Sequence, residues 1–108
     1  MAKWLLVVET KCSDPARETD FNEWYDKIHL PDVLETPGFT GATRYEISEA
    51  SEGKGKFLAA YDIETDNIDA FLKANTANMA NKRAAGRMSP LLVIVSRGLY
   101  KQTSSVSR

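Results

Sequence analysis

The sequence predicts an α+β fold of the ferredoxin-like type, in which a four-stranded antiparallel sheet carries two helices on one face. Two observations lead to this prediction. Four short segments have the two-residue alternation and apolar composition of strands, and two longer segments repeat apolar residues with helical spacing. These segments follow one another in the order β-α-β-β-α-β, which is the order of the split ferredoxin-like motif.

The predicted strands are Lys3–Thr10, Phe39–Ser48, Lys56–Glu64 and Leu91–Lys101. In the first strand Trp4, Leu6 and Val8 share one face, and Leu5 and Val7 share the other. Two helices cover only one face of a single sheet, so one apolar face stays open. Such a face predicts a second copy packed sheet to sheet, and therefore a homodimer.

The second strand and the turns around it follow from local signals. Alternation places Phe39, Thr43 and Tyr45 on one face, with Arg44 on the opposite face. Pro37-Gly38 is a turn signal before this strand, and the polar run 49–55 predicts a hairpin loop after it.

Ser13-Asp14-Pro15 is a start signal for the first helix, and Asp20 is the alternative start of its regular part. The helix is expected to end near His29, because Pro31 disfavours helical geometry at the residue before it. Thr65-Asp66-Asn67 offers N-caps for the second helix, which Pro90 is expected to break. The spacing of Asp32 and Glu35 fits a capping box for a short turn between these two helices.

Length and composition describe one ordinary globular domain. The chain has 108 residues, 43% of them hydrophobic and 27% charged, and we expect a domain over residues 1–102 with a flexible tail at 103–108. The longest apolar run is only as long as a strand, so we expect no membrane span and a cytoplasmic protein. The single cysteine excludes an internal disulfide, and no Cys/His cluster predicts a metal site.

The charges are unevenly distributed along the chain. Residues 1–69 hold all fifteen acidic residues and seven Lys or Arg, whereas residues 70–108 hold seven Lys or Arg and no acid. Pairing between the two halves is one interpretation of Lys82, Arg83 and Arg87, and reception of an anionic substrate group is the other. The basic residues form no dense run, so we expect no nucleic-acid partner.

The stretch 21–39 holds the only histidine and is the candidate site. Helical spacing places Asn22 and His29 together beside Tyr25, at the border between the core and a cavity. A histidine in the last turn of a helix is favoured in its protonated form, while burial opposes protonation, so the sequence predicts titration near neutral pH. The alternative is a helix cap that donates to free carbonyls. Asp32 either orients this imidazole or caps the following turn.

The pieces WYDKIHLPDVLETPGF and ATRY resemble the dimeric α+β barrel superfamily, specifically its EthD-like branch. The resemblance implies a ferredoxin-like subunit, two of which form the barrel, with a cavity between the helices and the sheet of each. It also implies that His29 points into this cavity as an acid, a base or a hydrogen-bond donor. Relatives of the polyketide-cyclase type use several histidines and this chain has one, so their mechanism is not carried over.

We therefore expect a cofactor-independent isomerase, cyclase or lyase that acts by proton transfer on a small apolar, aromatic or carbonyl-bearing metabolite. The expected catalytic residues are His29, Tyr25 and Asp32. The expected substrate-binding residues are Asn22, Trp24, Tyr45, Tyr61 and Arg44. The alternatives are a dimer that binds a small molecule or haem without turnover, and a structural, stress-associated dimer.

Overall fold

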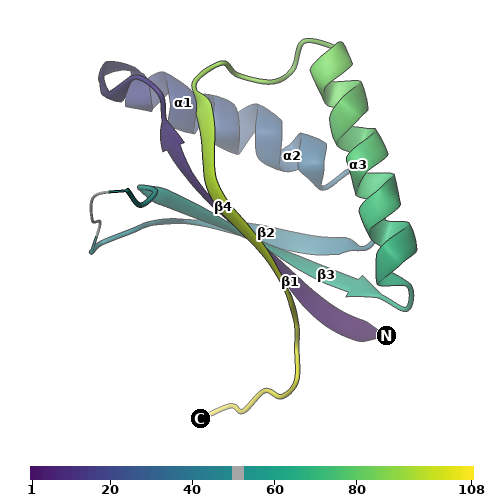
Figure 1. The fold of residues 1–108 in the computed structure, drawn as a ribbon. Helices are drawn as coiled ribbons and strands as arrows, with labels where there is room; N and C mark the ends of the chain where they lie inside the picture. The colour runs from purple at the N-terminus through teal and green to yellow at the C-terminus, as the bar shows by residue number, and fades with distance from the viewer. Residues whose placement is uncertain (50–52) are drawn as a thin grey trace.

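The computed structural model describes residues 1–49 and 53–108, and it confirms the predicted fold class (Figure 1). One antiparallel sheet has the strand order β2-β3-β1-β4, and all the helices lie on one of its faces. The strands are β1 (Ala2–Cys12), β2 (Phe39–Glu46), β3 (Phe57–Thr65) and β4 (Leu92–Lys101). The hairpin loop predicted at 49–55 lies partly outside the described residues.

The first helix does not end at His29, so that prediction is wrong. It comprises α1 (Glu18–Trp24), a π-helical turn (Tyr25–His29) and α2 (Leu30–Val33) in direct succession. Pro31 has no N–H to give to the carbonyl of Lys27, and its ring crowds that carbonyl. The wider π turn, closed by the bond from the Leu30 N–H to the Tyr25 carbonyl, accommodates the proline without ending the helix.

The start of this helix follows the predicted signal. A 3₁₀ turn at Pro15–Arg17 precedes α1, and the Asp14 carboxylate accepts a hydrogen bond from the Ala16 N–H at 3.1 Å.

The second helix, α3 (Ile68–Ala84), begins where predicted and ends earlier than predicted. The Asn67 side chain caps its start by accepting from the Ala70 N–H at 3.1 Å. Its end is set by Gly86 rather than by Pro90, because Gly86 has a positive φ of 74° and donates to the Arg83 carbonyl at 3.1 Å. Arg87 therefore lies beyond the helix.

The core lies between the helices and the sheet. Leu6, Tyr61 and Ile63 from the sheet are buried against Phe21 and Phe71 from the helices. As the alternation predicted, Leu5 and Val7 lie on the opposite face of the sheet, where they are half-buried. Across the described residues, no helix is long and apolar enough to cross a membrane.

A register shift in β2 reverses one sequence prediction. The pairing with β3 shifts between Phe39 and Gly41, which leaves Thr40 as an extra residue. Beyond this bulge Arg44 lies opposite Ala59 on the helix-facing side, and Tyr45 faces away and is 55% exposed. The alternation had placed Tyr45, not Arg44, on the same face as Phe39.

Gly38 joins the first helix to β2, and we expect its replacement to be more destabilising than that of Gly86. Gly38 has a φ of 113°, and an added Cβ would lie 2.7 Å from the Phe71 ring, whereas Gly86 has a φ of 74° and open space around it. Gly86→Ala adds backbone strain only, about 1 kcal/mol. Gly38→Ala adds a clash with the core to that strain, for a total of about 2–3 kcal/mol. Urea denaturation of both variants measures the difference, and equal losses would contradict the proposed clash.

Candidate functional site

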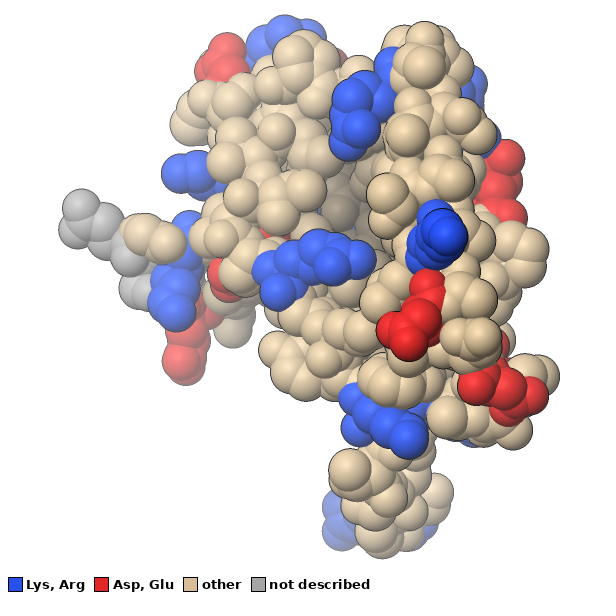
Figure 2. Space-filling model, turned by 45° about the vertical axis from the view of Figure 1, so that its right-hand side comes forward, with Lys and Arg blue, Asp and Glu red and all other residues tan. Residues whose placement is uncertain are grey.

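A cavity of about 140 Å³ lies between the helices and the sheet. Most of its wall is apolar, formed by Leu, Val, Ile and Met side chains of β1, α2, α3, β4 and the segment between α3 and β4. Its polar groups belong to Tyr25, His29, Tyr61, Asn75, Arg83 and Arg97. Figure 2 shows the molecule hollowed between the strands and α3, with Lys and Arg side chains at the rim.

His29 is held in the wall of this cavity by aromatic contacts. Its ring stacks on Trp24 with 4.7 Å between centroids and 22° between planes, and it meets the Tyr25 ring edge-on at 4.9 Å. The π turn places His29 well inside the helix, and only 7% of the residue is exposed. His29 is therefore more deeply buried than the sequence predicted, and it is not in a final helical turn.

Burial decides the protonation state of His29. It lowers the pKa of the imidazole from 6.5 to about 4, against the opposing charge of Asp32 and with a smaller contribution from Arg44 in the same direction. The prediction of titration near neutral pH is therefore wrong, because it relied on a helix end that does not exist at this residue. At neutral pH the imidazole is uncharged, with one nitrogen that accepts and one that donates.

Tyr25 and Tyr61 form the second polar group of the cavity. Their hydroxyl oxygens lie 3.4 Å apart, and both side chains are almost completely buried. Burial raises the pKa of each phenol, so both hydroxyls stay protonated. In such a pair one hydroxyl donates to the other, which leaves one O–H free to donate to a ligand.

Arg44 lies behind Tyr25 and does not line the cavity. Its guanidinium carbon is 4.1 Å from the centroid of the Tyr25 ring, in a cation–π contact. Its two terminal nitrogens donate to Asp26 Oδ1 and Asn22 Oδ1, each at 2.9 Å. Within the described residues its buried Nε has no hydrogen-bond partner. Arg44 thus fixes the position of Tyr25 and places a positive charge behind the cavity wall.

Asp32 is neither a helix cap nor bonded to the imidazole. Its buried carboxylate accepts from Arg87 Nε at 2.6 Å and from Arg87 Nη2 at 3.1 Å, and this bonding lowers the pKa of Asp32. The Arg87 carbonyl in turn accepts from the Trp24 indole at 2.9 Å. The capping-box prediction is wrong because Asp32 lies inside α2. The ion pair between Asp32 and Arg87 instead links α2 to the segment after α3.

The structure brings together only part of the predicted site. Tyr25, His29 and Tyr61 line the cavity, whereas Trp24, Asn22 and Arg44 lie behind its wall. Tyr45 lies on the opposite face of the sheet, and Asp32 is engaged by Arg87.

Sequence reasoning missed Asn75, Met79, Met88 and Arg97, which also line the cavity. Asn75 lies four residues after the buried Phe71, on the same side of α3, and this helical spacing is the signal that could have identified it. Its Oδ1 accepts from the Thr36 hydroxyl at 3.1 Å.

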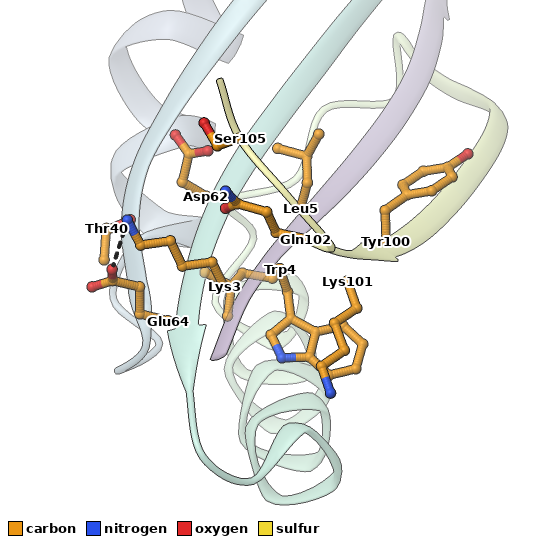
Figure 3. Close-up of a pocket in the computed structure, with 11 residues that line it drawn as sticks. Lys3, Trp4, Leu5, Thr40, Asp62, Glu64, Tyr100, Lys101, Gln102 and Ser105 are labelled. Carbon is orange, nitrogen blue, oxygen red and sulfur yellow. Dashed lines mark ion pairs between the residues drawn. The ribbon is translucent and has the colours of Figure 1, made fainter. Parts of the chain in front are cut away.

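A second hollow of about 530 Å³ lies on the face of the sheet opposite the helices, beside the C-terminal residues (Figure 3). It is bordered by an ion pair between Lys3 and Glu64, by Trp4 and by the half-exposed Tyr100. It does not reach His29 or the Tyr25–Tyr61 pair. The smaller cavity is therefore the candidate site. Among residues 1–49 and 53–108, no three His, Cys, Asp or Glu side chains converge on a possible metal position.

Comparisons with solved structures identify the same fold. An EthD-family protein from Bacillus halodurans shares 16% identity, with coverage of 95% of this chain and 100% of that chain and a TM-score of 0.61. SnoaB from Streptomyces nogalater, described as a cofactor-independent oxygenase, shares 13% identity, with full coverage of both chains and a TM-score of 0.63. MhuD from Mycobacterium tuberculosis, a heme-degrader with two hemes bound in its active site, shares 15% identity, with coverage of 96% of this chain and 99% of that chain and a TM-score of 0.65.

Sequence identities of 13–16% show that the fold is shared and nothing more. The family is identified by a separate comparison of the sequence with family models. No curated protein matches the chain. A family model described as a domain of unknown function, DUF4286, matches residues 4–88. The fold is that of the EthD-like dimeric α+β barrel proteins, and the chain belongs to the DUF4286 family.

Proposed function

We propose that this protein is a cofactor-independent enzyme that transfers a proton on a small, largely apolar metabolite. The main support for the proposal is that an uncharged, buried imidazole and a pair of buried phenols line the same apolar cavity. The reaction is of the isomerase, cyclase or lyase type. The comparison with SnoaB, which is described as a cofactor-independent oxygenase and has the same fold, supports chemistry without a cofactor on this fold.

His29 is the proposed base. An imidazole with a pKa of about 4 is unprotonated at neutral pH and is available to accept a proton, but it is a weak base. It is therefore suited to a proton that is already acidic, such as a C–H between two carbonyl groups or a phenolic O–H. When that proton moves to the imidazole, its electron pair stays on the substrate as an enolate or phenolate.

The Tyr25–Tyr61 pair is the proposed stabiliser of this anion. The one O–H that the pair leaves free donates to the substrate oxygen as negative charge develops on it. Arg44, with its charge over the Tyr25 ring, makes that phenol a stronger donor. His29 returns the proton at another atom of the substrate, which completes an isomerisation or a ring closure.

A haem does not fit this cavity. An unprotonated histidine is a suitable axial ligand, and two arginines line the cavity, but its volume of about 140 Å³ is well below the ~300–1,000 Å³ typical of larger ligands. The haem-binding alternative would require the helices to move apart. A Soret band on addition of hemin that His29→Ala abolishes would support this alternative over the proposed enzyme.

We expect His29→Ala to reduce the rate of proton transfer by about 10²–10⁴-fold. The measurement is deuterium incorporation at the carbon between the two carbonyl groups of a panel of single-ring 1,3-diketones, followed by NMR. His29→Gln tests whether a hydrogen-bonding side chain without basicity is sufficient, and Lys27→Ala, at an exposed position of the same π turn, is the matched control. Equal rates for wild type and His29→Ala, or no acceleration by the wild type of any diketone, would contradict the proposal.

The protein is further proposed to act as a homodimer through the open face of the sheet. This face carries the half-buried Leu5 and Val7, the exposed Tyr45 and the exposed Tyr100. Burial of this surface against a second copy removes apolar area from water, at about 25 cal/mol per Å².

Two adjacent residues of β1 test the dimer, because their side chains point in opposite directions. We expect Val7→Asp, on the open face, to dissociate the dimer and leave the subunit folded. Leu6→Asp places a charge in the core, at a residue only 3% exposed, and is expected to unfold the subunit. Analytical ultracentrifugation and circular dichroism measure the two effects. A wild-type protein that sediments as a monomer at micromolar concentration would contradict the proposed dimer.

A further inference from the structure

Among the described residues that line the cavity, two are cationic and none is acidic. Arg83 enters its wall from α3 and Arg97 from β4, so the two residues come from opposite sides. No Asp or Glu is among the residues that line it, and His29 is uncharged at neutral pH. The cavity is therefore electropositive, although the chain as a whole carries a formal charge of −1.

Neither arginine has an acidic partner among the residues that the structure describes. In this they differ from Lys82 and Arg87, the basic residues on either side of Arg83, which are both paired. Lys82 donates to Glu35 Oε1 at 2.7 Å, and Arg87 pairs with Asp32. Pairing between the halves of the chain thus accounts for Lys82 and Arg87. Arg83, which the sequence grouped with them, is left facing the cavity.

The remaining wall limits the size of the ligand. An apolar cavity of about 150 Å³ takes up a single benzene ring, and the present cavity is about 140 Å³. A guanidinium binds a carboxylate through parallel N–H donors, and both guanidiniums are on exposed residues at the rim, where the solvated end of a ligand would lie.

We infer that the ligand is a small carboxylate with an apolar body the size of one ring, whose carboxylate is bound between Arg83 and Arg97. The apolar body lies against the Leu, Val and Met side chains, and the reacting atoms reach His29 and the tyrosine pair. This inference rests on the proposed function for the chemistry at His29, but the anion site itself consists of other residues.

The test compares benzoate with benzamide, which has the same ring and no charge. Isothermal titration calorimetry of the wild type is expected to show benzoate binding at least about tenfold more tightly. In the double variant Arg83→Gln/Arg97→Gln this preference is lost, while benzamide binds as it does to the wild type. Lys73→Gln, which removes one positive charge from an exposed position of α3 away from the cavity, keeps the preference. Thermal melting of all the variants shows whether they are folded.

Several results would overturn the inference: no binding of benzoate at millimolar concentration, equal affinities for the two compounds, or a preference that survives the double substitution. His29→Ala distinguishes a failure of this inference from a failure of the proposed function. This variant is expected to prefer benzoate whether or not His29 is the base, because the anion site consists of the two arginines. If the arginines are not the anion site, the double variant retains benzoate preference, and the deuterium exchange of the diketones still depends on His29.

Discussion

The candidate site depends on how the first helix accommodates Pro31. A proline inside a helix removes a donor and crowds the carbonyl four residues earlier, and this usually ends or kinks the helix. Here the π-helical turn at Tyr25–His29 absorbs the proline, and the helix continues through α2. Single π turns inside α-helices are frequent at functional sites. In this protein the turn places His29 against the cavity and carries the chain on to Asp32.

The charges around this turn are arranged so that none of the acids faces the cavity. Asp32 is held on the far side by Arg87, and Asp26 is held at the surface by Arg44. Because the carboxylate of Asp32 is already paired, its charge offsets the effect of burial on the pKa of His29 only partly. The imidazole is therefore neutral, and among the described residues that line the cavity the full charges are the guanidiniums of Arg83 and Arg97.

The fold was predictable because it rests on patterns that are local in the sequence. Alternation along β1 identified its buried face, and the caps at Asp14 and Asn67 marked where the helices begin. Tyr25, His29 and Tyr61 were identified as site residues from local spacing and from the EthD-like resemblance, and all three line the cavity.

The rest of the site was not predictable, because it depends on irregular geometry and on contacts that are distant in the sequence. A single extra residue after Phe39 exchanged the faces of Arg44 and Tyr45, and nothing in the alternation marks that bulge. The pKa prediction for His29 failed because the rule for prolines placed a helix end where the chain forms a π turn. Arg83 and Arg97 lie on separate elements, so only the folded chain shows that both line one cavity.

His29 is a buried, unprotonated imidazole in the wall of the cavity, and the function proposed for the site depends on this state. As the chain has one histidine, NMR observes its Cε1–H signal without ambiguity, and the pH dependence of that chemical shift gives its pKa directly. We expect a midpoint near pH 4, with no further change between pH 6 and 8. A midpoint near 6.5, the ordinary value for histidine, would show that the imidazole is solvated and would contradict its proposed role.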